Sequence, residues 1–347
     1  MPGMHPAPHR IAINGYGRIG RCFVRALYES DCRESFEIAA INEPADLSSM
    51  AYLTRFDSTH GRFPGKVGVG DGALLIEGDE IPVFHATTPE AVAWDALNVD
   101  LLVECSGVYG NRASLTRFLN AGCKRLLLSH PGDSAADVDA TIVYGTNHNT
   151  LAGKERLVSS ASCTTNAVVP VLSLLHQELG IEQAVLTTLH SVMNDQPLID
   201  GYHDRDLRRT RSAMQSIVPV STGLARGVER LLPELKGRVH AKAIRVPTHN
   251  VSAIDMVLSV ERDVDTTSLN RLLQDATTGP YAGLIAYSED PHASIDFNHD
   301  FHSAIIDGAQ TNVSGQRLVN LMLWFDNEWG FVNRLLDVAR HWLRQSA

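Results

Sequence analysis

The sequence predicts an α/β Rossmann dinucleotide-binding domain followed by an α+β catalytic domain with a mostly antiparallel sheet. The chain has 347 residues, more than one hydrophobic core usually serves. Strands and helices alternate in the first part, where a glycine-rich turn joins the first strand to the first helix. Further along, runs of strands have fewer helices between them, which is typical of an antiparallel sheet. We expect the first domain to span residues 1–161 and the second 162–327.

The chain begins with a predicted strand, a glycine-rich turn and a helix. Residues 10–14 have the pattern of a short buried strand, residues 15–20 carry the pattern GxGxxG, and residues 21–28 have helical periodicity. In this context the three glycines allow a tight turn, the approach of a pyrophosphate and close packing of the helix on the strand. We therefore predict a dinucleotide site, against the simpler interpretation of a glycine-rich turn. The predicted cofactor-binding residues of this domain are Asn14, Gly15, Gly17, Arg18, Ile19, Glu43 and Ser129.

Glu43 directly follows the second predicted strand, residues 36–42. A carboxylate in this place accepts hydrogen bonds from ribose hydroxyls and repels a 2′-phosphate. This favours NAD over NADP; the alternative is an ordinary surface glutamate at a strand end. The other elements predicted for this domain are strands over 100–105 and 124–129, a helix over 112–120 and an antiparallel excursion between Gly61 and His85.

The second half of the chain contains a strand over 184–190 that ends in a histidine, followed by a polar loop rich in arginine. The loop, residues 194–218, is longer than a simple connector, which favours a functional role. The remaining predicted elements are a helix from Gly223 to Leu235, strands over 243–246 and 251–260, a helix over 267–276, a strand over 318–325 and a closing amphipathic helix to Leu343.

Cys163 lies in the stretch SASCTTN, residues 160–166, which precedes the apolar run 167–175. The run predicts a helix that Ser162 or a neighbouring hydroxyl would cap, so Cys163 falls in the first turn, beside unpaired backbone N–H groups. Such a position lowers the pKa of a thiol and favours the nucleophilic thiolate. The alternative is a buried cysteine that acts as a small apolar residue, but its neighbours here are polar.

Composition argues against several classes of protein. The net charge of -10 argues against a nucleic-acid partner, because affinity for nucleic acid comes from clustered lysine and arginine. No apolar run is long enough to cross a membrane, and the first ten residues lack the apolar core of a secretory signal, so we expect a cytoplasmic protein. One basic cluster would suit a phosphorylated ligand, a solvated loop or a subunit contact. It consists of Arg205, Arg208, Arg209 and Arg211.

The five cysteines are odd in number and widely spaced. This spacing matches neither a disulfide framework nor a metal site, so we expect reduced thiols and no metal. They are Cys22, Cys32, Cys105, Cys123 and Cys163.

Five motifs, in order along the chain, closely resemble the glyceraldehyde-3-phosphate dehydrogenase superfamily. They are INGYGRIGR, ASCTTN, TTLHS, RVPT and WFDNEWG. The resemblance covers nearly the whole chain from Arg10 onward. It implies a Rossmann domain, a catalytic domain, a C-terminal helix over 328–347 that packs back on the first domain, and a homotetramer. NAD is the implied cofactor, and a small phosphorylated aldehyde is the implied substrate.

The resemblance also assigns roles to residues of the second half. Cys163 matches the family's nucleophile and His190 its activating base, although a lone histidine is more often a packed or surface residue. Asn327 matches the residue that holds the carboxamide of the cofactor; by itself it would be taken for a turn residue. The implied substrate contacts are Ser162, Cys163, Thr164, Arg209, Thr222, Gly223 and Arg245. Thr222 and Gly223 would serve equally well to cap a helix.

The implied reaction is the NAD-dependent oxidation of an aldehyde through a thioacyl intermediate on Cys163. Segments such as HSVMNDQ and DLRRTR favour D-erythrose 4-phosphate as substrate and 4-phospho-D-erythronate as product, at the entry to pyridoxal 5′-phosphate biosynthesis. The alternative is the phosphorylating oxidation of glyceraldehyde 3-phosphate. Met193 departs from that pattern, which usually has threonine there, because a thioether cannot donate a hydrogen bond. An alternative of another class is a nucleotide-binding regulator that has lost the chemistry.

Overall fold

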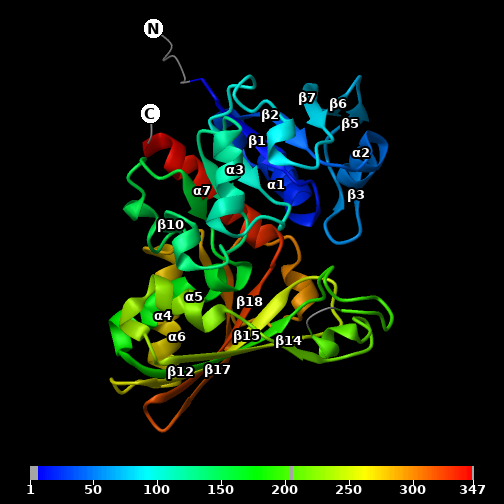
Figure 1. Ribbon diagram of the computed structural model, residues 1–347. Helices are drawn as coiled ribbons and strands as arrows, with labels where there is room; N and C mark the ends of the chain where they lie inside the picture. Colours follow the sequence, from blue (N-terminus) through cyan, green and yellow to red (C-terminus); the bar gives the residue numbers. More distant parts are fainter. Residues whose placement is uncertain (1–6, 204–205, 346–347) are drawn as a thin grey trace. The chain divides into compact units, whose positions relative to one another are not determined.

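The computed structural model describes residues 7–203 and 206–345, and Arg205 of the basic cluster lies outside them. The chain divides into two compact units, Met1–Ser162 with Val332–Ala347 and Cys163–Phe331 (Figure 1). We refer to them as the first unit and the second unit. Within the described residues, no helix combines the length and the apolar character that crossing a lipid bilayer requires.

A nine-stranded sheet forms the centre of the described part of the first unit. The strand order is β10-β11-β9-β8-β1-β2-β7-β6-β5, in which the pairs from β10 to β7 are parallel and those among β7, β6 and β5 are antiparallel. Its strands are β1 (His9–Asn14), β2 (Phe36–Asn42), β5 (Val67–Val69), β6 (Ala73–Ile76), β7 (Asp79–Phe84), β8 (Leu101–Glu104), β9 (Leu126–Leu128), β10 (Ala140–Thr141) and β11 (Leu157–Ser159). β3 (Phe56–Asp57) and β4 (Gly61–Arg62) form a separate hairpin.

The central strands of this sheet are apolar without alternation. Residues 11–13, 101–103 and 126–128 are fully buried, as expected for parallel strands covered on both faces. The helices of the unit are α1 (Arg18–Glu29), α2 (Leu47–Arg55), α3 (Arg112–Asn120) and the part of α7 (Trp329–Gln345) that begins at Val332. Because the chain order of β1, β2 and β8 reverses around β1, the carboxyl ends of these strands form a switch point, which is where α/β sheets bind ligands.

The second unit contains a seven-stranded sheet in the order β13-β14-β12-β15-β18-β17-β16. Adjacent strands in this sheet are antiparallel, except for the parallel pairs β12–β14 and β16–β17. The elements are α4 (Cys163–Leu179), β12 (Ile181–His190), β13 (Val218–Val220), α5 (Leu224–Leu231), β14 (Val239–Arg245), β15 (Ser252–Val260), α6 (Thr266–Thr278), β16 (Ile285–Ser288), β17 (Ala304–Ser314) and β18 (Leu318–Phe325). Buried and less buried residues alternate along β15 and β18, and Figure 1 shows α4, α5 and α6 gathered on one side of the sheet.

The predicted fold class is confirmed, and several details of the prediction are wrong. The helix predicted from Gly223 to Leu235 ends at Leu231, and a separate 3-10 helix covers Pro233–Leu235, because proline lacks the N–H that continues a helix. The first helix begins at Arg18 rather than at residue 21. The strands β16 and β17 were not predicted at all.

Asp326 connects the end of β18 to the start of α7. Its carboxylate accepts hydrogen bonds from the backbone N–H groups of Glu328 (2.9 Å), Trp329 (2.7 Å) and His299 (2.7 Å). The first two bonds satisfy donors of the first helical turn, as a capping residue does. This carboxylate therefore fixes the geometry of the residue that follows it, Asn327.

Replacing Asp326 with alanine is expected to lower the free energy of unfolding by about 2–3 kcal/mol, because one buried and two partly buried N–H groups lose their acceptor. The matched control is Asp326→Asn, which keeps one carbonyl oxygen as the cap and should lose less. Thermal denaturation of the three proteins measures the difference. Equal midpoints for wild type and Asp326→Ala would contradict the capping role.

Candidate functional site

The three glycines of the turn between β1 and α1 have different surroundings. Gly15 has φ +88°, and a Cβ there would lie 2.5 Å from the backbone nitrogen of Ser106. A Cβ on Gly20 would lie 2.2 Å from the carbonyl oxygen of Gly15. A Cβ on Gly17 would meet nothing within 4 Å. The first and third glycines are thus required by packing, whereas the second leaves open space above the backbone.

That open space lies at the N-terminus of α1. Gly17 is the N-cap and supplies no side-chain hydrogen bond, and the first turn carries no acidic side chain. The positive end of the helix dipole therefore faces this space without a neutralising acidic side chain in the first turn, which favours an anion there. This arrangement fits the pyrophosphate of a dinucleotide.

Glu43 lies beside the same turn, after the end of β2. Its carboxylate accepts hydrogen bonds from the backbone N–H groups of Tyr16 (2.7 Å) and Ala45 (3.1 Å). The side chain is therefore oriented toward the glycine-rich turn. A carboxylate in this place suits the ribose hydroxyls of NAD and disfavours a 2′-phosphate.

The other predicted cofactor residues have different surroundings. Asn14 is buried, donates to the carboxylate of Glu104 and accepts from Asn42 (2.8 Å), so its side chain joins the ends of β1, β2 and β8 instead of facing solvent. Arg18 forms an ion pair with Asp57. Ile19 is half-buried in the first turn of α1, and Ser129 is half-buried directly after β9.

The contrast between two of the glycines yields a matched pair of variants. Gly17→Ala should keep a melting temperature within a few degrees of wild type, since its Cβ meets nothing, but should weaken NAD binding roughly tenfold or more by filling the space of the pyrophosphate. Gly20→Ala should instead destabilise the protein by about 1–3 kcal/mol, because its Cβ collides with backbone. Calorimetric titration with NAD and thermal denaturation separate the two. Unchanged NAD affinity in Gly17→Ala would argue against this site.

In the second unit, Cys163 and His190 lie close together. Cys163 is the first residue of α4 and His190 is the last residue of β12. The Cys163 Sγ atom is 3.8 Å from His190 Nε2 and 3.9 Å from Thr164 Oγ1. Two chain segments that are separate in sequence thus bring a thiol within reach of an imidazole. This is the geometry of a nucleophile and its base.

The pKa of the Cys163 thiol is shifted in the direction opposite to the sequence prediction. Burial raises the pKa of the Cys163 thiol above its ordinary value, although the Thr164 hydrogen bond and the charge of Arg245 oppose the change. Burial and the Arg245 charge lower the pKa of His190 to about 4. The shift of the Cys163 pKa therefore opposes the thiolate that the sequence predicts, because desolvation outweighs the helix N-terminus.

Arg245 lies at the end of β14, directly beside His190. The two residues are register partners in the parallel pair β12–β14, and only 9% of Arg245 is exposed. Its Nη1 atom is 2.7 Å from His190 Nδ1, and its Nη2 atom is 3.9 Å from the Asp195 carboxylate. Asp195 also accepts a hydrogen bond from Arg209 (2.8 Å). Two arginines and one carboxylate thus border the thiol–imidazole pair, and they could hold an anionic ligand.

Asn327 is oriented by two serines that the sequence did not single out. Its Oδ1 atom accepts from the hydroxyls of Ser191 (3.0 Å) and Ser252 (2.8 Å), and Ser252 also accepts from the backbone N–H of Ser191 (3.1 Å). The amide NH₂ group is thereby directed away from the serines as a donor. Serines directly after His190 and at the start of β15 carry no sequence signal for this role.

The remaining predicted substrate residues are less closely placed. Thr222 is exposed and accepts a hydrogen bond from the Leu224 N–H (3.2 Å), which is the capping role considered as the alternative. Gly223 is the exposed N-cap of α5. Ser162 directly precedes α4, and Arg209 belongs to a 3-10 helix, Leu207–Thr210.

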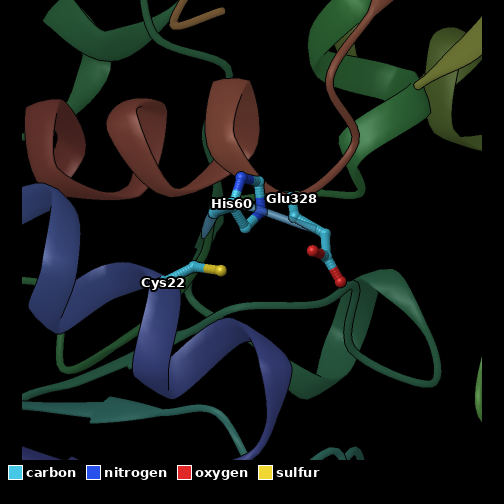
Figure 2. Close-up of side chains that lie close together, drawn as sticks. All are labelled: Cys22, His60 and Glu328. Carbon is cyan, nitrogen blue, oxygen red and sulfur yellow. The ribbon is translucent and has the colours of Figure 1, made fainter. Parts of the chain in front are cut away.

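Figure 2 labels two residues of the first unit that lie close together, Cys22 on α1 and His60 on the loop between β3 and β4. The sulfur and a ring nitrogen are within 4.8 Å, and both residues are buried. The third labelled residue, Glu328, belongs to the second unit. Two ligands within one unit are fewer than the four of a structural metal site.

A Rossmann-type sheet with a dinucleotide-binding turn, in one chain with a cysteine–histidine pair, defines a nucleotide-dependent oxidoreductase. Residues 9–112 match the NAD binding domain of glyceraldehyde 3-phosphate dehydrogenase, and residues 162–327 match the C-terminal domain of the same enzyme. The chain therefore belongs to the glyceraldehyde 3-phosphate dehydrogenase family. It is an NAD-dependent oxidoreductase, and the predicted cofactor and enzyme class are confirmed.

Proposed function

We propose that this enzyme is a D-erythrose-4-phosphate dehydrogenase. It would oxidise D-erythrose 4-phosphate to 4-phospho-D-erythronate with NAD, at the entry to pyridoxal 5′-phosphate biosynthesis. The observation that carries the aldehyde chemistry is the 3.8 Å approach of Cys163 Sγ to His190 Nε2, with Arg245 against the same ring. Arg245 offers a planar guanidinium to the substrate phosphate.

The first chemical step uses both members of the pair. His190 Nε2 takes the proton of the Cys163 thiol, and the sulfur attacks the aldehyde carbon to form a carbon–sulfur bond. The carbonyl electron pair moves to oxygen, which takes the proton back from the imidazolium and gives a hemithioacetal. The backbone N–H of Cys163, at the start of α4, is a suitable donor to the developing oxyanion.

The oxidation leaves an acyl group on the sulfur. His190 takes the hydroxyl proton of the hemithioacetal as the carbon gives up its hydrogen with two electrons, and a thioester to Cys163 forms. Bound NAD supplies the acceptor for that hydride. Asn327, oriented by Ser191 and Ser252, would donate to the carboxamide of the cofactor. His190 first gives the hydroxyl proton to solvent. Water then attacks the thioester with the neutral His190 as base, and the imidazolium protonates the leaving sulfur, which releases the acid and restores the thiol.

Met193 supports water as the final acceptor. Its side chain is 46% exposed, two residues before Asp195, at the position where the phosphorylating enzymes usually carry a threonine. A thioether offers no hydrogen bond to an incoming inorganic phosphate. The alternative function is phosphorylating oxidation of glyceraldehyde 3-phosphate, and the two matching family domains fit either substrate.

A paired-substrate assay tests the proposal. Initial rates of NADH formation are compared for D-erythrose 4-phosphate and glyceraldehyde 3-phosphate, each with and without inorganic phosphate. We expect the four-carbon aldehyde to have the higher kcat/KM, with a rate that does not depend on phosphate. Strong phosphate dependence together with preference for the three-carbon aldehyde would establish the alternative. Lack of turnover with either aldehyde would favour a nucleotide-binding regulator.

We also propose that the enzyme is a homotetramer in the cytoplasm. The loop between β12 and β13 supports assembly, because it carries large apolar side chains that are each at least 70% exposed: Leu198, Ile199, Tyr202, Leu207 and Ile217. An exposed apolar group of this kind marks an interaction surface. Light scattering coupled to size exclusion measures the mass, and a monomer would contradict the proposal.

A further inference from the structure

The first unit contains a cavity in which every polar side chain of the lining is a cation. The cavity has a volume of about 480 Å³, and it is lined by Arg55, Arg62, Phe63, Pro64, Gly65, Lys66 and Val67. No carboxylate and none of the predicted cofactor residues is among these lining residues. Because the chain as a whole has a net charge of -10, the cavity is a local exception that attracts anions.

The β3–β4 hairpin brings two of the cations together. Arg55 is the last residue of α2, and its backbone oxygen accepts a hydrogen bond from the Phe63 N–H (2.9 Å). Arg62 is the register partner of Phe56 in the hairpin. The guanidinium carbons of Arg55 and Arg62 lie over the Phe56 ring, at 5.7 Å and 5.8 Å from its centre. A single aromatic ring thus holds both guanidinium groups through its negative faces.

Hydrogen bonds fix the third cation and the opposite wall of the cavity. Arg55 Nη2 donates to the backbone oxygen of Val67 (2.6 Å). Glu77 holds the backbone of Lys66 on both sides, since its N–H donates to the Lys66 oxygen (3.0 Å) and its carboxylate accepts from the Lys66 N–H. The cations are therefore positioned by the fold itself, which reduces the ordering that a ligand would have to impose.

The two carboxylates next to these segments have other partners. Asp57 forms an ion pair with Arg18, and Glu77 accepts the backbone hydrogen bond from Lys66. Among the residues that the structure describes, no ion pair or hydrogen bond joins the side chain of Arg62 or Lys66 to another residue. Three positive charges thus share one cavity without a counter-charge, and an anion in the cavity would relieve their mutual repulsion.

We propose that this cavity binds a small anion with two linked phosphate groups. A planar guanidinium pairs with two phosphate oxygens at once, and the ammonium of Lys66 adds a point charge. A phosphate group on a side chain carries a charge of about −1.5 to −2 at pH 7, so two linked groups balance three cations better than one does. The volume also lies within the range of about 300–1,000 Å³ that is typical of small-molecule sites. This inference does not depend on the proposed function.

Calorimetric titration of the NAD-saturated enzyme with inorganic pyrophosphate tests the proposal. The bound NAD keeps the probe away from the N-terminus of α1. We expect pyrophosphate to bind roughly tenfold or more tightly than inorganic phosphate, and less tightly as the salt concentration rises. Adenosine diphosphate distinguishes the source of the ligand: equal affinity for the two probes indicates an inorganic diphosphate, and higher affinity for adenosine diphosphate indicates a nucleotide.

Two variants of exposed cavity residues, Arg62→Gln and Lys66→Gln, should each weaken pyrophosphate binding about tenfold, because each removes a charge-assisted contact. The matched control is Lys154→Gln, since Lys154 is an exposed lysine of the same unit outside the cavity. It should leave the affinity unchanged, and thermal denaturation checks that all three variants are folded.

Three results would overturn the inference. They are no binding of pyrophosphate at millimolar concentration, equal affinities for pyrophosphate and inorganic phosphate, and an affinity that neither cavity variant changes. The titration contains no aldehyde, so its outcome is independent of the paired-substrate assay that tests the proposed function.

Discussion

Cys163→Ser is expected to lower kcat by about 10⁴-fold or more, because a hydroxyl in this position is a far weaker nucleophile than a thiol. The covalent step then has no substitute, since the carbon–sulfur bond is what retains the acyl group after oxidation. Rapid mixing should show the loss directly: wild type gives a burst of NADH in the first turnover, and the variant gives none. NAD affinity should stay unchanged, because the glycine-rich turn belongs to the other unit.

Cys123→Ala is the matched control for that variant. Cys123 is a buried cysteine of the first unit, and burial raises the pKa of its thiol to about 12. Its removal should lower stability slightly and leave kcat within about twofold. A Cys163→Ser enzyme that keeps activity within tenfold of wild type would rule out the thioacyl intermediate. Equal losses in the two variants would do the same.

His190→Asn is expected to lower kcat by about 10²–10⁴-fold, because both the thiol and the hemithioacetal hydroxyl lose their base. It should also change how stability depends on pH. The pKa of His190 in the folded protein is about 4, below the ordinary value of about 6.5. Protons therefore bind the unfolded chain first as the pH falls. The contribution of His190 to the free energy of unfolding is therefore fully present above pH 6.5 and is lost as the pH falls from 6.5 to 4.

That loss amounts to about 3 kcal/mol in wild type and should be missing in His190→Asn. Urea unfolding at pH 7.5 and pH 4.5 gives the free energy of unfolding at each pH. The difference between the two values should be smaller in His190→Asn than in wild type. His240→Asn is the control, since His240 is exposed on β14 and lies outside the site. The same pH dependence in wild type and His190→Asn would show that the ring is not held in its neutral form.

The local elements of the first unit could be predicted because their signals are short-range. The apolar strand, the pattern GxGxxG and the following helix occupy neighbouring residues, and Gly20 answers a steric demand within the turn itself. Cys163 at the start of a helix could be predicted in the same way, from polar residues followed by an apolar run. The strand β17 was missed because its apolar pattern is interrupted near Gly308, and its pairing with β18 shifts register after Asp307.

The environment of the candidate site could not be predicted, because it depends on contacts between distant segments. Arg245 reaches His190 through the register of two parallel strands, and Ser252 reaches Asn327 from 75 residues away. The direction of the Cys163 pKa was also wrong from sequence, since burial, which outweighs the helix terminus, is a property of the folded unit.

The sequence by itself therefore determined the fold class and the glycine-rich turn of the NAD-binding domain, because both depend on residue type and on neighbours along the chain. Only the tertiary structure decided the directions in which the pKa values of the thiol and the imidazole are shifted. The packing of chain segments decides how far a side chain is removed from water and which groups it contacts. For Cys163 and His190, most of these segments are distant in the sequence.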